Sequence, residues 1–328
     1  MRTAGLFDLQ VNGFAGVDFN AGTIDAAALD HALAAMRATG VTACLPTVIT
    51  ASADALAVRL PALDRAVAES RLGPAMVPGY HLEGPFLNAA DGFIGCHPPE
   101  AATLPDAGLV EALASGLSRP ILLVTIAPEL DGSASFIRAM TARGRVVAIG
   151  HSAADFAAVS ATAEAGARLS THLGNGLPQT LHKLDNPLFA QLAEDRLAAS
   201  FIADGVHLPP QALKAMLRAK GIDRSILVSD AVAAAGAPPG LYPFAGTVVE
   251  HAADGSVRIP GGRSLAGSAL CLDQAVRNVV NWGLAGPQEA IRMASDNPRR
   301  LMAPALEAYG ITLTGPEIRW SADLRPVG

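Results

Sequence analysis

The feature that most constrains the fold is an alternation of short apolar runs with segments of helical periodicity. The runs are apolar throughout rather than at every second residue, which is typical of parallel strands buried on both faces. Successive parallel strands need long crossovers, and the helical segments supply them. The eight predicted strands cover residues 5–11, 41–47, 75–82, 121–127, 146–149, 168–171, 197–202 and 225–228. Eight such units that close on themselves form an α/β fold of the (β/α)8 TIM barrel type.

A doubly wound open sheet is the alternative interpretation of this alternation. Its dinucleotide-binding form carries G-x-G-x-x-G after the first strand, and the loop 12–16 lacks that pattern. The polar residues that end strands are also spread over strands three to eight, rather than gathered at one switch point. Both observations favour the barrel.

The rest of the chain predicts additions to one barrel rather than a second domain. A β-hairpin insertion is expected at about 242–263, because the turn residues 253–256 separate two β-rich runs. A short C-terminal tail is expected at about 303–328, and its part from Ile311 to Gly328 has room for one or two strands. We find no repeat or low-complexity linker in the 328 residues, so we expect a single domain over 1–328.

Composition narrows the cellular setting. The 24 basic and 30 acidic residues are mixed along the chain, so nucleic acid is not an expected partner. No apolar run reaches membrane-spanning length and no signal peptide is evident, so no membrane association is expected. Cys44, Cys96 and Cys271 are far apart and form no CxxC pair. They indicate reduced thiols in a cytoplasmic protein.

Lone polar residues follow several predicted strands. Glu83, His151 and His172 come at the ends of strands three, five and six. In a barrel these ends meet at one face, and three protein ligands with one open position are what a catalytic zinc-type site uses. A single histidine there can instead be a hydrogen-bonded residue of the barrel mouth, but three ligands together favour a metal.

Further polar residues lie at the same end of the predicted barrel. Asp230 ends strand eight, where it can exchange a proton with water or a leaving group, or alternatively cap the next turn. His207 could polarise a carbonyl or hold a substrate anion, or have only a structural role. His97, in the long loop after Glu83, is a similar candidate, and His81 is expected to neighbour the site rather than bind the metal.

At these residues the chain resembles the amidohydrolase superfamily, and more narrowly N-acetylglucosamine-6-phosphate deacetylases. The resemblance extends from residue 5 to about 300, and its separate pieces are individually weak but occur in order. The matching pieces are Phe7-Asp8-Leu9-Gln10-Val11-Asn12-Gly13, Leu45-Pro46-Thr47, His81-Leu82-Glu83-Gly84-Pro85-Phe86, Ala127-Pro128-Glu129, Gly150-His151-Ser152, Thr171-His172-Leu173-x-Asn175, Ile202-Ala203-Asp204-Gly205-x-His207, Ser229-Asp230-Ala231 and Leu265-Ala266-Gly267-Ser268.

The resemblance implies metal-dependent removal of an acetyl group from an N-acetylated amino sugar, with N-acetylglucosamine-6-phosphate as the first expected substrate. It implies that Glu83, His151 and His172 bind one divalent metal, zinc, and that Asp230 is the general base and acid. The substrate contacts that it implies are His97, Asn175, Gly176, Lys183, His207, Leu265, Ala266 and Gly267. Gln10 and Asn12 stand where many amidohydrolases carry His-x-His for a second metal, which argues for a single-metal site.

Two departures from the family pattern bear on the substrate. The resemblance implies a β-sandwich domain built from both chain ends, and this sequence is expected to lack its N-terminal half, because the predicted barrel begins within ten residues of Met1. Lys183 falls, by counting, where the family has an arginine that contacts the sugar phosphate, often across a homodimer interface. Lysine can bind phosphate or be a solvated loop residue. Hydrolysis of an unphosphorylated N-acetyl sugar or an N-acyl amino acid is the enzymatic alternative, and a non-catalytic barrel that binds sugar or metal is the alternative from another class.

Overall fold

A parallel barrel forms the centre of the protein. The computed structural model describes residues 1–262 and 264–327. Its eight-stranded sheet has the spatial order β11-β10-β9-β8-β7-β6-β5-β2, and the neighbouring strands in it run parallel. The strands are β2 (Leu6–Val11), β5 (Val41–Ile49), β6 (Tyr80–Glu83), β7 (Ile121–Ile126), β8 (Val146–Ile149), β9 (Leu169–Ser170), β10 (Ala198–Ile202) and β11 (Ser225–Val228). The predicted barrel is confirmed.

The barrel closes just beyond the ends of β2 and β11. The backbone N–H of Asp230 donates to the carbonyl of Gln10 at 3.0 Å, and that of Asn12 donates to the carbonyl of Ala231 at 2.7 Å. The segments that close the barrel therefore also carry candidate site residues.

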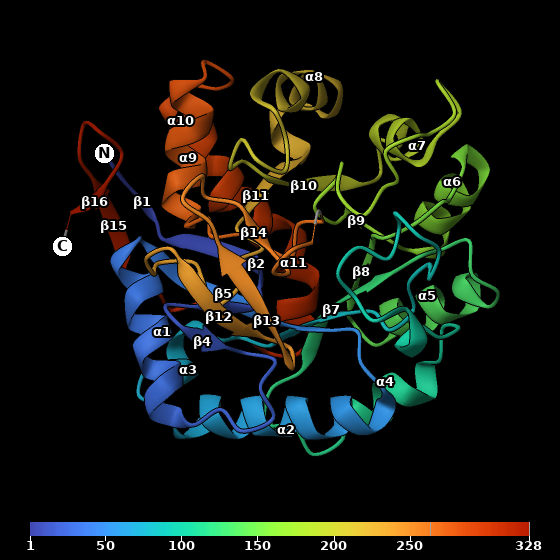
Figure 1. Ribbon diagram of the computed structural model, residues 1–328, viewed down its shortest axis with the longest axis horizontal. Helices are drawn as coiled ribbons and strands as arrows, with labels where there is room; N and C mark the ends of the chain where they lie inside the picture. The colour runs from blue at the N-terminus through green and yellow to red at the C-terminus, as the bar shows by residue number, and fades with distance from the viewer. Residues whose placement is uncertain (263, 328) are drawn as a thin grey trace.

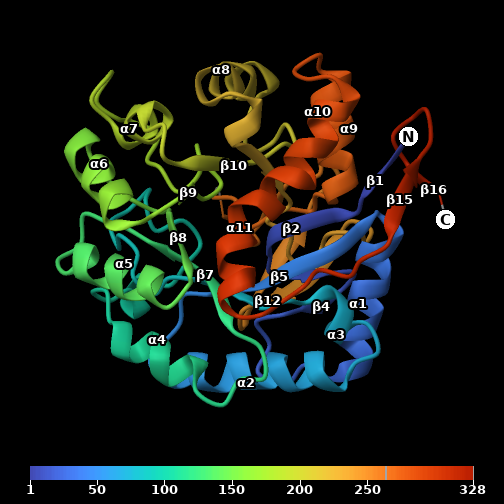
Figure 2. The ribbon, with the colours of Figure 1, turned by 180° about the vertical axis from the view of Figure 1, so that it is seen from behind.

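Helices surround the strands (Figures 1 and 2). They are α1 (Ala26–Ala38), α2 (Ala53–Glu69), α3 (Gly73–Met76), α4 (Ala107–Ala114), α5 (Ser133–Ala142), α6 (Phe156–Ala165), α7 (Pro187–Ala193), α8 (Pro210–Lys220), α9 (Leu272–Asn281), α10 (Pro287–Ala294) and α11 (Asp296–Ala308), with short 3-10 turns η1 (Pro99–Ala101) and η2 (Ile222–Arg224). Side chains cap several of them: Ser52 accepts from the N–H of Ala55, and Asp155 from that of Ala158. Among the described residues, no helix is long and apolar enough to cross a membrane.

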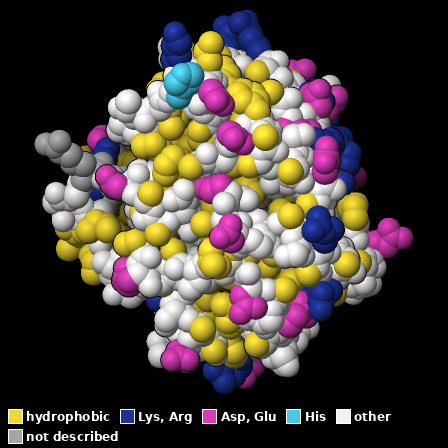
Figure 3. Space-filling view, turned by 90° about the vertical axis from the view of Figure 1, so that its right-hand side faces the viewer, with side chains coloured by type: hydrophobic (Ala, Val, Ile, Leu, Met, Phe, Trp, Pro, Cys, Tyr) yellow, Lys and Arg dark blue, Asp and Glu magenta, His cyan; other side chains and the backbone are white. Residues whose placement is uncertain are grey.

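Burial explains why the strand sequences are apolar throughout. Every residue of β2, β5, β6, β7 and β8 is buried. One side of each strand packs inside the barrel and the other packs against the helices, so neither face tolerates an unpaired polar group. Acidic and basic side chains are interspersed over the outer face shown in Figure 3.

Three small sheets in the described residues are added to the barrel. β12 (Gly240–Phe244), β13 (Thr247–His251) and β14 (Val257–Arg258) form an antiparallel sheet, which is the predicted insertion with one strand more than a hairpin. Arg263, the last residue of that predicted segment, lies outside the described residues. At the chain ends, β1 (Arg2–Ala4) pairs with β15 (Glu317–Trp320), and β15 pairs with β16 (Pro326–Val327), so the two termini lie side by side (Figure 1). Gly328 is also outside the described residues, and a two-stranded pair, β3 (Gly13–Phe14) and β4 (Val17–Asp18), completes the fold.

The structure corrects two element boundaries. The third strand was expected from residue 75, but α3 occupies Gly73–Met76 and β6 starts only at Tyr80. Pro74 lies in the first turn of α3, where its missing N–H costs no hydrogen bond. The expected tail from about 303 overlaps α11, which runs to Ala308 because residues such as Met302 and Leu306 bury one helical face. The two prolines inside α11 concealed this helix in the sequence.

Candidate functional site

The candidate site is a cavity of about 760 Å³ at the carboxyl ends of the strands. Its walls come from the loop after β6, the loop after β9 and the β12–β14 sheet. The first two walls touch each other, because a Cβ placed on Gly92 would lie 2.6 Å from Pro178. This volume suits a small-molecule ligand.

A repeated local geometry brings three candidate side chains into the cavity. His151, His172 and Asp230 each come two residues after the last residue of their strands, β8, β9 and β11. Each has a positive φ, of 52°, 29° and 48° respectively. Residues other than glycine rarely adopt this left-handed conformation, which costs of order 1–3 kcal/mol and is concentrated at functional sites.

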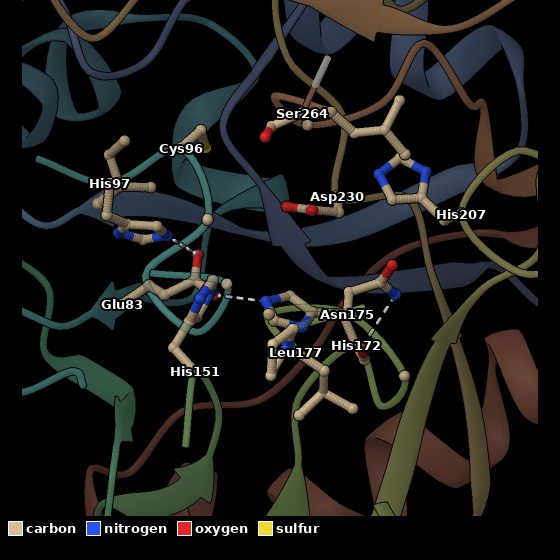
Figure 4. Close-up of a pocket in the computed structure, with 18 of the residues that line it drawn as sticks. Glu83, Cys96, His97, His151, His172, Asn175, Leu177, His207, Asp230 and Ser264 are labelled. Carbon is tan, nitrogen blue, oxygen red and sulfur yellow. Dashed lines mark hydrogen bonds and ion pairs between the residues drawn. The ribbon is translucent and has the colours of Figure 1, made fainter. Parts of the chain in front are cut away.

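The carboxylate of Glu83 lies at the centre of the histidines (Figure 4). Its Oε1 is 2.8 Å from Nε2 of His172 and 3.5 Å from Nε2 of His151. Its Oε2 is 4.0 Å from Nε2 of His97. All four side chains are at most 7% exposed.

This group fits a divalent metal ion. The Nδ1–H of His151 donates to the carbonyl of Phe93 at 2.7 Å, which orients Nε2 toward the carboxylate, as is usual for a metal-binding histidine. A cation bound between the ring nitrogens and the carboxylate would compensate for the burial of these groups. The ligand atoms of Glu83, His97 and His151 all lie within 4.8 Å of one another. His97, expected as a substrate contact, therefore belongs to this group, and the expected ligand His172 adjoins it through its 2.8 Å contact with Glu83.

The electrostatics of the cluster follow from its burial and its pairing. Burial acts to raise the pKa of Glu83, but hydrogen bonds with His151 and His172 outweigh it and hold that pKa well below its usual range. Burial lowers the pKa of His97 to about 3. The pKa of Asp230 is raised to about 6, first by burial and then by the charge of Glu83. A carboxylate with such a pKa can both accept and return a proton near neutral pH.

Two amides orient the two carboxylates. Gln10 donates through Nε2 to Oε1 of Glu83 at 3.0 Å and accepts from the hydroxyl of Thr171. Asn12 donates through Nδ2 to Oδ1 of Asp230 at 2.8 Å. Gln10 and Asn12 thus donate hydrogen bonds to the site carboxylates. This role agrees with the expectation that they do not bind a second metal as a His-x-His pair would.

His81 belongs to the structure rather than to the cavity. Its Nδ1 is 3.3 Å from the hydroxyl of Thr47, and its Nε2 is 2.8 Å from that of Thr125. Burial lowers its pKa to about 4, which keeps the ring neutral between these partners.

The predicted substrate contacts divide into two groups. Most of them line the cavity: His97, Asn175, Gly176, His207, Leu265 and Gly267. Ala266 is fully buried and is not among the lining residues, and Lys183 is exposed and outside the lining as well.

Several lining residues were missed by the sequence interpretation. Asp91 and Cys96 lie in the loop after β6, whereas Phe244 and Arg258 come from the β12–β14 sheet. The length of the loop after β6 was the only sequence signal for Asp91 and Cys96. Nothing local in the sequence points to Phe244 or Arg258.

Comparisons with known proteins agree with this geometry. N-acetylgalactosamine-6-phosphate deacetylase of Escherichia coli O157:H7 is 34% identical over 90% of this chain and 76% of its own. N-acetylglucosamine-6-phosphate deacetylase of Bos taurus is 35% identical over 91% of this chain and 73% of its own, and the human enzyme is 34% identical over the same shares. No protein-family model matches the chain.

Solved structures show the same fold. The crystal structure of N-acetyl-D-glucosamine-6-phosphate deacetylase from Mycobacterium smegmatis matches with a TM-score of 0.87 and 28% identity, over all of this chain and 85% of the other. A mutant of that enzyme in complex with N-acetyl-D-glucosamine-6-phosphate matches with a TM-score of 0.86, 28% identity, and 99% and 84% coverage. Together with the curated relatives, these matches show that the chain belongs to the N-acetylglucosamine-6-phosphate deacetylase family of amidohydrolases.

Proposed function

We propose that this protein is a metal-dependent deacetylase that hydrolyses the acetamide of an N-acetylated amino-sugar phosphate, and that the whole chain acts as one hydrolase barrel. The observation that carries the proposal is the convergence of three histidines on Glu83, with Asp230 held by Asn12 in the same cavity. Family membership supports the reaction class.

Glu83, His151 and His172 would hold the metal ion, with His97 close enough to contribute. The nitrogen-rich donor set with one carboxylate suits zinc, which is our proposed metal. When bound, such an ion supplies Lewis acidity that activates water and polarises a carbonyl.

The remaining chemistry falls to side chains in the cavity. Asp230 accepts a proton from the attacking water and later gives it to the departing nitrogen, so that the C–N bond breaks and acetate and an amine are released. Asn12 fixes the carboxylate of Asp230 for both transfers. His207 follows the carboxyl end of β10 and lines the cavity, where it can contact the substrate.

The phosphate is the part of the substrate that the site identifies least directly. Lys183 is exposed and outside the cavity lining, whereas Arg258 lines the cavity. This placement favours Arg258 over Lys183 as the phosphate contact within one chain. The exposure of Lys183 outside the cavity lining is the observation that favours the second candidate function, deacetylation of an unphosphorylated N-acetyl sugar or an N-acyl amino acid.

In a homodimer, Lys183 of one copy could still contact the substrate phosphate in the other. Its exposed loop, which also carries the exposed Leu184, could reach the cavity of a second copy. We propose a cytoplasmic location on separate grounds, because Cys44, Cys96 and Cys271 are all free thiols.

A substrate panel tests the proposal. Purified, metal-loaded protein is assayed for acetate release from N-acetylglucosamine and N-acetylgalactosamine, each with and without 6-phosphate, and from N-acetyl amino acids. We expect turnover of a 6-phosphate and one bound divalent ion per chain by elemental analysis. A loss of activity in Lys183→Ala that is confined to phosphorylated substrates would show that Lys183 contacts the phosphate. An unchanged KM for the phosphorylated substrate would show that Lys183 is a solvent-exposed residue without a role in substrate binding. A protein that binds sugar or metal but releases no acetate from any substrate would refute the proposed function.

A further inference from the structure

The imidazole of His207 is held by a neighbouring carboxylate. Asp204 follows β10 by two residues, and its Oδ2 is 2.6 Å from Nδ1 of His207. The two side chains are only 11% and 6% exposed. A contact this short between buried groups is a charge-assisted hydrogen bond.

The other oxygen of Asp204 fixes the turn that carries His207. Oδ1 accepts the backbone N–H groups of Val206 and His207, both at 2.8 Å. Gly205, between Asp204 and Val206, has a φ of 81°, and a Cβ on it would come within 3.3 Å of Trp282. The imidazole therefore has a fixed position before any ligand binds.

The polarity of the contact determines what His207 presents to the cavity. An ionised carboxylate can only accept, so the proton of the contact is on Nδ1. Burial acts to raise the pKa of Asp204, but its hydrogen bonds with His207 and the adjacent backbone hold it below the usual value. No described residue bonds the second ring nitrogen, Nε2, and His207 lines the cavity (Figure 4). Nε2 offers a lone pair if the ring is neutral, and an N–H with a positive charge if it is protonated.

We propose that Asp204 is a positioning residue that keeps His207 as an imidazolium, so that the cavity presents one N–H donor and one positive charge to a negatively charged oxygen of the substrate. This inference rests on the proposed deacetylase function for the nature of the ligand. Two oxygens have that chemistry: the oxyanion that forms from the acetamide, and a sugar phosphate. A buried carboxylate favours the imidazolium because the nearby negative charge compensates the cost of burying the positive one.

Asp204→Asn separates charge from hydrogen bonding. The asparagine keeps Oδ1 for the two backbone N–H groups, but its Nδ2 donates toward Nδ1 of His207. The ring then becomes neutral with its proton on Nε2, so the donor remains while the charge is lost. Asp195→Asn is the matched control, since Asp195 is 79% exposed and pairs with Arg224 on the surface.

The first measurement needs no substrate. Nitrogen-15 NMR of the metal-loaded protein, assigned by comparison with His207→Gln, should show both ring nitrogens of His207 protonated at pH 7. In Asp204→Asn only Nε2 should carry a proton. A neutral His207 ring in the wild-type protein at pH 7 would overturn the inference, whether or not Asp204→Asn folds.

The second measurement is kinetic. Asp204→Asn should lower kcat/KM about tenfold to a hundredfold, because a hydrogen bond to a charged group is replaced by a neutral one. A fall in kcat on phosphorylated and unphosphorylated substrates alike assigns the charge to the oxyanion, and a rise in KM confined to the phosphorylated substrate assigns it to phosphate. Asp204→Asn combined with His207→Gln should be no slower than His207→Gln alone. Wild-type kinetics in Asp204→Asn, or additive losses in the double variant, would contradict the role of Asp204. An inactive wild-type protein would instead refute the proposed function, and the NMR measurement would still report the protonation of His207.

Discussion

Glu129 gives the sharpest test of how the site is supported. Its carboxylate accepts three hydrogen bonds: from Nδ2 of Asn88 at 2.9 Å, and from the hydroxyl of Ser152 and the N–H of Ala153 at 2.6 Å each. Ser152 and Ala153 directly follow His151, which holds a left-handed backbone conformation. Glu129 thus clamps the turn that directs His151 toward Glu83, although it touches none of the proposed metal ligands itself.

Glu129→Gln removes one acceptor and the negative charge. The amide nitrogen that replaces Oε1 or Oε2 cannot accept from Ala153 or Ser152, so at least one short bond is lost. Loss of such a supporting contact weakens metal binding by about 10- to 100-fold, or roughly 1.4–2.7 kcal/mol. This is comparable with one hydrogen bond to a charged group.

Competition with a chromophoric zinc chelator measures the effect. We expect a 10- to 100-fold weaker zinc affinity in Glu129→Gln, with the wild-type affinity kept in Glu164→Gln. Glu164 is a suitable control because its side chain is 69% exposed and pairs with Arg196 at the surface. A folded Glu129→Gln protein with wild-type zinc affinity would show that the clamp does not position His151.

Two further predictions concern other groups. Asp230→Asn should lower kcat by about 10²- to 10⁴-fold while elemental analysis still finds the metal, and retained turnover would remove Asp230 from the mechanism. Lys220 is fully buried, where its Nζ donates to the carbonyls of Gln191 and Glu194, and burial lowers its pKa to about 8. The unfolded chain keeps that proton up to about pH 10.4, so the contribution of Lys220 to the free energy of unfolding should rise with pH between these values. Urea titrations of the wild type and Lys220→Met at pH 7.5 and 10 check this, and equal pH dependence in the two proteins would contradict it.

The sequence predicted the barrel and the centre of its site for one physical reason. A parallel barrel buries both faces of its strands, so its strands must be apolar and any polar residue at their ends stands out. Glu83, His151, His172 and Asp230 were all visible in this way, and the structure brings the three proposed ligands together.

The walls of the cavity were less predictable because long-range contacts build them. Arg258 and Phe244 reach the cavity only because the β12–β14 sheet folds back over the barrel, and Lys183 is left outside it by the course of a long loop. The loop after β6 is placed by its contact with Pro178, almost a hundred residues further along the chain. α11 was missed because its two prolines resemble helix breakers, whereas burial of Met302 and Leu306 outweighs them.

The common placement of His151, His172 and Asp230, two residues after their strands, also bears on how such an enzyme can change. These side chains are carried by turns, so their identity can alter without shifting the register of any strand. A new ligand could be recruited at the matching position after another strand while the hydrogen-bonded barrel stays as it is. β7 is closed to this route, because its matching residue is Pro128, whose ring does not permit a positive φ. The barrel therefore offers a small set of interchangeable positions for new chemistry, and its own sequence decides which of them are available.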